Sequence, residues 1–263
     1  MIPELNHVYC AEAITLMQSW PAGSIDFIFT DPPYGHNNNN GDLIHNREAA
    51  LGLSPSCESD RSRVARPIAN DGKEANILVQ AFFAEAKRLL KPGCCCCCCC
   101  CGGGPDPQFA RWSLWLDEHL DFKQMVIWDK GPMGMGWHYR RSYETVLVAQ
   151  KPGAACAWYD ETHSVENIIR PGTAPKIIPS QDQHPTEKPV ELATLFINYD
   201  TRSGDSVLDP FCGSGSTLDA ANRLGRKWIG IELDPQFHAM ASERMNRAIV
   251  LPPQKAIEQG RLF

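Results

Sequence analysis

The feature that most constrains the fold of this chain is a glycine-rich turn, DPFCGSGS at residues 209–216, between a short apolar strand and a helix. The pattern predicts the strand over 206–208 and the helix over 217–224. Glycines in such a turn let the backbone approach a ligand closely, and the first turn of the helix offers unpaired N–H groups. The Gly-x-Gly spacing alone is equally consistent with a purely structural turn.

The next strand favours a ligand site of the nucleotide-binding kind. It is predicted over 227–231 and is followed by Glu232, about 20 residues after the turn. A nucleotide-binding sheet places an acidic residue at this position, where it binds ribose hydroxyls. Glu232 or the nearby Asp234 could instead be a solvated strand end or a helix cap.

Strand and helix patterns alternate along the rest of the chain. Further strands are predicted over 25–30, 122–128 and 143–149, and helices over 74–90, 105–120, 189–199 and 236–249. This alternation predicts an α/β fold with a parallel-dominated sheet covered by helices on both faces. The segments 36–72 and 154–183 show no clear periodicity.

The cysteines are concentrated in one place. Eight of the twelve form an unbroken run at residues 94–101, and the others are Cys10, Cys57, Cys156 and Cys212. A disulfide scaffold spaces its cysteines along a short secreted chain, so this class is excluded. Adjacent cysteines on a strand alternate between faces and cannot converge on one ion, which argues against a metal cluster. Because buried cysteine behaves as a small hydrophobic residue, a buried strand is physically possible for this run.

Charge and targeting signals narrow the class further. The chain has 25 Lys and Arg against 31 Asp and Glu, a net charge of −6. Binding to a nucleic acid by bulk charge is therefore excluded, and any such contact needs a local basic surface. The first residues lack a secretory signal, and no apolar stretch approaches the roughly 18 residues of a membrane span. We therefore expect a cytoplasmic protein with reduced thiols.

A second motif, DPPYG at residues 31–35, directly follows a predicted strand. Its two prolines fix the backbone and remove two donors, so the carbonyl groups stay free to accept hydrogen bonds. An aspartate acceptor, a rigid carbonyl and an aromatic face within four residues suit a flat group that carries an NH₂. A proline-rich turn with an aspartate cap is the simpler alternative.

A third motif, HPTEKP at residues 184–189, opens the helix that precedes the glycine turn. Thr186 is a candidate N-cap, and with Lys188 it could hold a carboxylate at the helix N-terminus. A well-capped helix without a ligand would have the same sequence.

Together these motifs resemble the amino-methyltransferases that act on DNA. The match is to the permuted class, in which the DPPY tetrapeptide precedes the cofactor loop, and it includes GIE at 230–232 and the segment 128–151. The resemblance implies a Rossmann-like methyltransferase fold with a mixed, mostly parallel seven-stranded sheet. It places a core strand of that sheet at the cysteine run, 94–101. It also implies a single DNA methylase domain over 1–263, with a catalytic half at about 20–130 and a cofactor-binding half at about 184–248. A target-recognition insertion is expected at about 131–182.

The resemblance also implies a catalytic role for the tetrapeptide. Asp31 and the Pro32 carbonyl would accept the two N–H hydrogens of an exocyclic amine and so direct its lone pair towards a methyl sulfonium. Tyr34, beyond Pro33, would stack on a target base that has left the double helix. Methyl transfer would then be in-line and governed by positioning.

The implied cofactor is S-adenosylmethionine. The positions that correspond to its contacts in this family are Asp209, Phe211, Gly213 and Gly215 in the glycine turn, Glu232 on the ribose, and Thr186 and Lys188 near the methionine carboxylate.

The implied substrate is double-stranded DNA, and a cognate restriction endonuclease is an expected partner. Aspartate at the head of the tetrapeptide favours the adenine amine over the cytosine amine. The motif order disfavours methylation of RNA or of a protein glutamine. A non-catalytic DNA-binding protein with a vestigial cofactor pocket is disfavoured because all the expected catalytic residues are present. Arginines clustered in two segments are the candidate DNA contacts: Arg61, Arg63, Arg66, Arg140 and Arg141.

Overall fold

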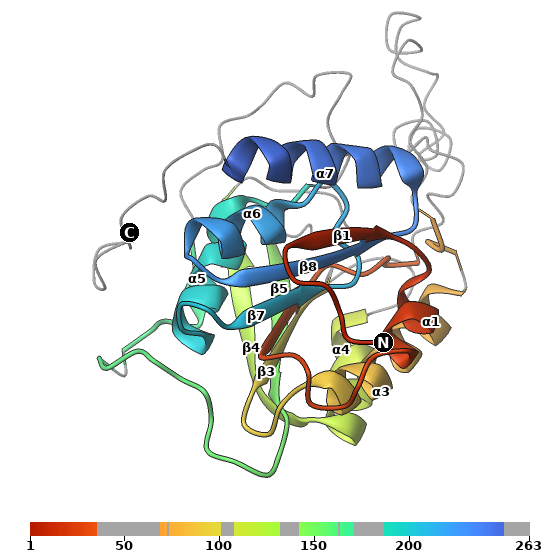
Figure 1. Cartoon of the computed structure of the whole chain (residues 1–263). Coiled ribbons are helices and arrows are strands. Elements are labelled where there is room, and N and C mark those ends of the chain that lie inside the picture. Colours follow the sequence, from red (N-terminus) through yellow and green to blue (C-terminus); the bar gives the residue numbers. More distant parts are fainter. Residues whose placement is uncertain are drawn as a thin grey trace, which may run out of the picture.

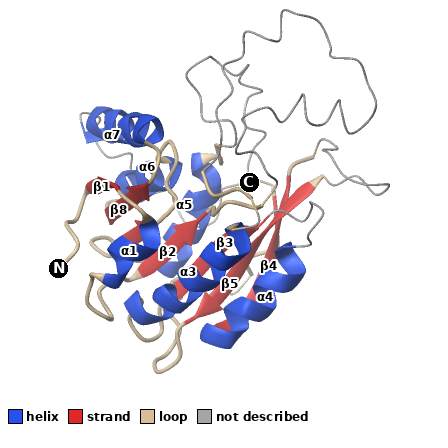
Figure 2. Ribbon diagram, turned by 90° about the vertical axis from the view of Figure 1, so that its right-hand side faces the viewer, coloured by secondary structure: helices blue, strands red, loops and turns tan. Residues whose placement is uncertain are grey.

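Within the described part of the chain, eight strands form one sheet in the order β1-β8-β7-β2-β3-β5-β4-β6 (Figure 2). The computed structural model describes residues 1–35, 69–72, 74–100, 108–131, 142–162, 164–170 and 187–249. The strands are β1 (His7–Cys10), β2 (Phe27–Thr30), β3 (Cys95–Cys100), β4 (Asp121–Asp129), β5 (Tyr143–Gln150), β6 (Ile168–Ile169), β7 (Ser206–Asp209) and β8 (Lys227–Glu232).

The sheet is mixed and mostly parallel, as predicted. β5 is antiparallel to both of its neighbours, β3 and β4, while every other pair of adjacent strands is parallel. The expected count of seven strands is wrong, because the described residues contain eight. The sequence patterns missed β6, whose two residues are too few for a periodicity, and β1, where only Val8 is buried.

Helices cover both faces of the sheet (Figures 1 and 2). Those of the described residues are α1 (Ala13–Gln18), α3 (Ala75–Leu89), α4 (Gln108–His119), α5 (Val190–Asp200), α6 (Ser216–Arg223) and α7 (Pro235–Ile249). Buried side chains of α1, α3 and α4 pack on one face, and those of α5, α6 and α7 pack on the other. None of the helices in the described ranges has the length and apolar character needed to cross a membrane.

The cysteine run forms the central strand β3, as predicted. It is parallel to β2 on one side and antiparallel to β5 on the other. Cys96 and Cys98 belong to the core that carries α3, while Cys95, Cys97 and Cys99 belong to the core that carries α5. All five are at most 1% exposed, so the small side chains contribute to both hydrophobic cores.

Gly230 of β8 lets helix α6 approach the sheet closely. A Cβ atom at this position would lie 2.6 Å from Cδ1 of Leu218 and 3.0 Å from the sulfur of Cys212. Both neighbours are buried, Leu218 in α6 and Cys212 in the glycine turn. The missing side chain thus allows the strand, the turn and the helix to pack together.

We therefore expect Gly230→Ala to lower the free energy of unfolding by about 1–3 kcal/mol, because the added methyl group overpacks the core. Urea denaturation of the two proteins measures the difference. In a Leu218→Ala background the same substitution should cost less, since the obstructing Cδ1 atom is gone. A cost within about 0.5 kcal/mol of zero in the wild-type background would contradict the close packing.

Candidate active site

The DPPYG motif, the glycine turn and Glu232 meet at one edge of the sheet, where β2, β7 and β8 end. β7 lies between the other two, and all three strands are parallel. Asp31 follows β2, the glycine turn follows β7, and Glu232 ends β8. A hydrogen bond of 2.7 Å from the Thr30 hydroxyl to Oδ1 of Asp209 joins the ends of β2 and β7. This edge is where open α/β sheets bind their ligands.

Asp31 lies against two donors that the sequence assigned to different roles. Oδ2 is 2.8 Å from Nζ of Lys188, and the Tyr34 hydroxyl donates a hydrogen bond to Oδ1. The Lys188 ammonium also lies 5.2 Å from the centre of the Tyr34 ring. Burial raises the pKa of Asp31, and the positive charge of Lys188 opposes that rise. Lys188 therefore favours the ionised carboxylate, which can only accept hydrogen bonds.

Lys188 contacts a second carboxylate, Glu144 of β5, which sequence reasoning did not select. Oε2 of Glu144 is 3.2 Å from Nζ of Lys188, and Oε1 is 2.6 Å from Nζ of Lys130. Burial acts to raise the pKa of Glu144, but the two ammonium groups outweigh it and hold this pKa below its usual value. The only sequence signal was that Glu144 lies within the segment 128–151.

The backbone of the tetrapeptide is fixed from outside the motif. Gln108 donates a hydrogen bond from Nε2 to the Tyr34 carbonyl, and the Trp112 ring centre lies 6.0 Å from that of Tyr34. The N–H of Gly35 donates to Oδ1 of the buried Asp71 at 2.7 Å. These contacts hold the tetrapeptide against α4 and the segment 69–72. Pro32 is buried and Pro33 is partly exposed.

Asp209 is buried at the start of the glycine turn and organises it. In addition to the Thr30 hydroxyl, Oδ1 accepts the backbone N–H of Phe211 at 3.1 Å. Burial raises the pKa of Asp209 to about 7, although hydrogen bonds from Thr217, Thr30 and Phe211 favour the charged form. The ring of Phe211 meets that of Phe82 on α3 edge-on, with the ring centres 5.7 Å apart.

The turn and the end of β8 are held together by Glu232. Oε2 accepts the N–H of Gly213 at 2.9 Å, and Oε1 accepts the N–H of Asp234 at 2.8 Å. Gly213 and Gly215 have φ angles of +51° and +86°, in the left-handed region that favours glycine. The predicted glycine turn between a strand and a helix is therefore confirmed, and its cofactor contacts stay predictions.

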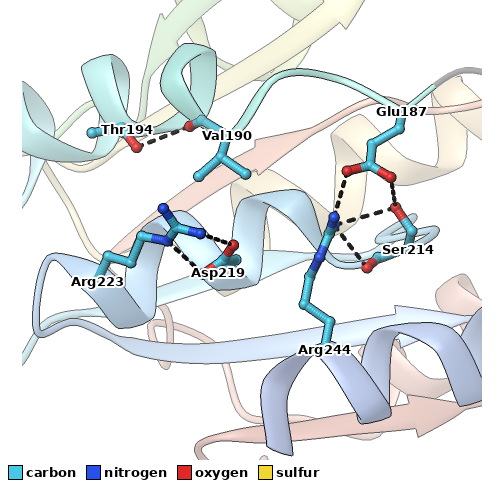
Figure 3. A network of polar contacts seen from close by, with 7 residues as sticks. All are labelled: Glu187, Val190, Thr194, Ser214, Asp219, Arg223 and Arg244. Carbon is cyan, nitrogen blue, oxygen red and sulfur yellow. Dashed lines mark hydrogen bonds and ion pairs between the residues drawn. The ribbon is translucent and has the colours of Figure 1, made fainter. Parts of the chain in front are cut away.

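A network that the sequence did not predict ties the HPTEKP motif to the turn (Figure 3). The Ser214 hydroxyl donates to Oε2 of Glu187 at 2.8 Å, and Nη2 of Arg244 lies 2.5 Å from Oε1 of Glu187. Nη1 of Arg244 donates to the Ser214 carbonyl at 3.0 Å. Arg244 belongs to α7, so the network connects three segments that are distant in the sequence.

Six predicted site residues lie outside the described residues: Thr186, Arg61, Arg63, Arg66, Arg140 and Arg141. Their assigned roles stay predictions. Of the cofactor contacts that the resemblance implied, the structure brings Asp209, Phe211, Gly213, Gly215 and Glu232 together at the turn. Lys188, which the resemblance placed near the methionine carboxylate, forms ion pairs with Asp31 and Glu144, and its contact with the cofactor stays a prediction.

The residues of the turn fit a nucleoside-type cofactor such as S-adenosylmethionine. No side chain of the described residues caps the N-terminus of α6, where Gly215 is the N-cap. Glu232 accepts a backbone N–H on each oxygen, and a carboxylate offers about four acceptor positions in all, so it can also accept a hydroxyl group. Glycine backbone and an oriented acid at a strand end are the donor and acceptor set that a ribose site needs.

Comparison with known proteins agrees with this geometry. The model of the DNA methylase family matches residues 25–243, which is most of the chain. The chain belongs to this family. Among its relatives, the Type II methyltransferase M.HindIII of Haemophilus influenzae is 28% identical over 300 residues, covering 92% of this chain and 95% of the relative.

Solved structures share the fold of this DNA methylase. TTHA0409 of Thermus thermophilus, in complex with S-adenosyl-L-methionine, has a TM-score of 0.63 and 23% identity over 92% of this chain and 95% of its own. PvuII DNA methyltransferase, described as cytosine-N4-specific, has a TM-score of 0.65 and 18% identity over 94% of this chain and 92% of its own. At these identities the likeness concerns the fold alone.

The raised pKa of Asp209 predicts a pH dependence of stability. Because the pKa is about 7 in the folded protein and about 3.9 in an unfolded chain, the folded state binds the extra proton between these values. Its contribution is fully present below about pH 3.9 and is lost as the pH rises through about 7. Asp209→Asn keeps the shape but cannot titrate.

The difference in unfolding free energy, wild type minus Asp209→Asn, should therefore fall as the pH is raised from about 5 to about 8. Urea denaturation at a series of pH values measures it, and taking the difference cancels the titrating groups that do not interact with Asp209. A difference that stays constant across this range would contradict the raised pKa.

Proposed function

We propose that this DNA methylase transfers the methyl group of S-adenosylmethionine to the exocyclic amine of adenine in double-stranded DNA. The observation that carries the proposal is the meeting of the DPPY tetrapeptide and the glycine turn at one sheet edge, joined by the 2.7 Å bond between Thr30 and Asp209. This arrangement sets a hydrogen-bond acceptor for an amine beside the turn that fits the cofactor.

The chemistry depends on the amine's lone pair, which is delocalised into the base ring. Asp31 and the Pro32 carbonyl accept the two N–H hydrogens and so direct the lone pair out of the ring plane. Tyr34 offers its ring to the base, which has to leave the double helix to reach these groups. The bound cofactor would supply an electrophilic methyl group on a sulfonium. As the N–C bond forms, the S–C bond breaks and leaves its electron pair on sulfur as a neutral thioether, and the methylated amine gives up one N–H proton to solvent. The protein's contribution is mainly positioning.

The glycine turn and its surroundings hold the cofactor in this proposal. Glu232 binds the ribose hydroxyls, and the backbone of Gly213 and Gly215 allows close approach. The network of Glu187, Ser214 and Arg244 supports this proposal, because it fixes the segment before α5 against the turn. Thr186, in the same motif, is assigned to the methionine carboxylate.

Adenine is preferred to cytosine because the tetrapeptide begins with aspartate. A cytosine amine presents the same pair of hydrogens, and the two bases are the outcomes that the experiment separates. The target-recognition insertion at about 131–182 and the arginine clusters supply the local basic surface that a chain of net charge −6 needs. A cognate restriction endonuclease completes the proposed biological context.

The test is methylation of PCR-amplified DNA, which carries no methyl groups, followed by digestion to nucleosides and mass spectrometry. The expected product is N6-methyl-2′-deoxyadenosine. Asp31→Asn should lower the rate by about 100-fold or more, because the neutral amide is a weaker acceptor and its NH₂ opposes the amine. S-adenosylmethionine affinity, measured by calorimetry, should change by less than about twofold.

Methylated cytosine in the digest would reject the adenine assignment and keep the enzyme class. Wild-type rates in Asp31→Asn would reject the mechanism. A protein that binds S-adenosylmethionine but transfers no methyl group to any DNA sequence pool would reject the proposed function.

The arginine cluster in 61–66 gives a separate prediction about DNA binding. Replacing Arg61, Arg63 and Arg66 together by Ala should weaken DNA binding at low salt. The slope of log K against log salt should become shallower by up to about 2.7, since each phosphate contact contributes about 0.9. Binding titrations from about 50 to about 200 mM salt measure this slope. An unchanged affinity and slope would show that the cluster does not touch DNA.

A further inference from the structure

The amine acceptor of the proposed reaction is occupied by the protein itself. Oδ2 of Asp31 lies 2.8 Å from the Lys188 ammonium, and Oδ1 accepts the Tyr34 hydroxyl. The same ammonium lies 5.2 Å from the centre of the Tyr34 ring, the ring on which the target base would stack. The Lys188 side chain is only 10% exposed, so water solvates its ammonium poorly and the charge needs a carboxylate partner.

A second acceptor for this ammonium lies ready beside it. Oε2 of Glu144 is 3.2 Å from Nζ of Lys188, compared with 2.8 Å for Oδ2 of Asp31, so the ammonium is shared between two carboxylates and lies closer to Asp31. Apart from this ion pair, Oε2 is a buried atom with no other partner among the described residues. Its partner oxygen is held by Lys130 at 2.6 Å, so the Glu144 carboxylate is fixed with one oxygen facing the ammonium.

We propose that Lys188 is a positioning residue that passes from Asp31 to Glu144 when the target base enters, freeing Asp31 to accept the amine. The proposal rests on the proposed methyl transfer. In this proposal Glu144 affects the reaction by binding the Lys188 ammonium and not by contacting the target base. Lys188 is already paired with both carboxylates, so it can shorten its contact with Oε2 of Glu144 as it gives up the one with Asp31.

The charges of the site favour such an exchange. Asp31 and Glu144 carry two negative charges, and Lys130 and Lys188 carry two positive charges, so the four groups sum to zero in either arrangement. No ion has to enter or leave a largely buried site. A charge left without its partner there would be strongly destabilising.

A fixed structural salt bridge is the competing explanation, and two variants separate the explanations. Glu144→Gln removes the charged second acceptor, so Lys188 stays on Asp31 and the base has to displace it without compensation. We expect the single-turnover rate on PCR-amplified DNA to fall by about tenfold or more, with S-adenosylmethionine affinity changed by less than about twofold. Glu144→Asp keeps the charge and should retain more of the rate than the Gln variant.

Lys188→Met should change the pH profile. In this variant the charged and titratable groups around Asp31 are Tyr34, Glu144 with its partner Lys130, and Asp209. The carboxylates of Asp31 and Glu144 then repel each other, since the ammonium between them is gone. Asp31 should hold its proton to higher pH, so the acidic limb of the rate profile should move up by about one unit or more. Adding Glu144→Gln to this variant should move the limb back down, because the repulsion is gone.

The double variant also tests whether Glu144 acts through Lys188. If it does, Lys188→Met with Glu144→Gln should be no slower than Lys188→Met alone at the pH optimum of each. Glu243→Gln, which breaks an exposed ion pair with Arg247 on α7, is the matched control and should leave the rate unchanged. Thermal unfolding of every variant checks that it is folded.

Three results would overturn the exchange: a Glu144→Gln rate within about twofold of wild type, losses that multiply in the double variant, or a Glu144→Asp rate as low as that of the Gln variant. If thermal unfolding shows that Glu144→Gln is poorly folded, the pH profile of Lys188→Met decides the question without it, because an acidic limb that does not move would overturn the proposal. A wild-type protein without methyl transfer would reject the proposed function instead, so the two failures are distinguishable.

Discussion

The hydrogen bond between Thr30 and Asp209 is the interaction on which the site depends most. It links two parallel strands at the edge where both end, one leading into the tetrapeptide and the other into the glycine turn. The bond is buried, so its donor and acceptor would each be costly to leave unpaired. Because β2, β7 and β8 run in the same direction, the DPPYG motif, the glycine turn and Glu232 all lie at the same edge of the sheet.

Much of this arrangement could be read from the sequence because its signals are local. A strand followed by DPPY, or by DPFCGSGS, predicts a turn at a strand end, and the parallel sheet places such ends together. The cysteine run was recognisable as a core strand because the resemblance places one there and small apolar side chains suit burial. The short β6 and the half-exposed β1 gave no such signal in the sequence patterns, and the expected count of seven strands came from the resemblance.

The charged centre of the site could not be predicted in the same way. Lys188, Asp31 and Glu144 come from three segments that only the folded sheet brings together, and Glu144 is carried by β5, the strand that runs against its neighbours. The motif around Lys188 suggested a carboxylate partner, and the structure supplies two from the protein. Which carboxylate a buried lysine pairs with is decided by tertiary packing, where opposite charges have to match to offset the loss of water.

The cysteine strand β3 has a property that follows from its uniformity. In an ordinary strand a slip of one residue exchanges the inward and outward side chains, and the sequence thereby fixes the register. In β3 a slip of one residue replaces each cysteine by another cysteine, so the side chains do not specify the register. It is held at the start of the strand, where Gly93 and Cys94 exchange backbone hydrogen bonds of 2.9 Å with Lys151. Gain or loss of one cysteine would leave both faces chemically identical and change only the length of chain that follows.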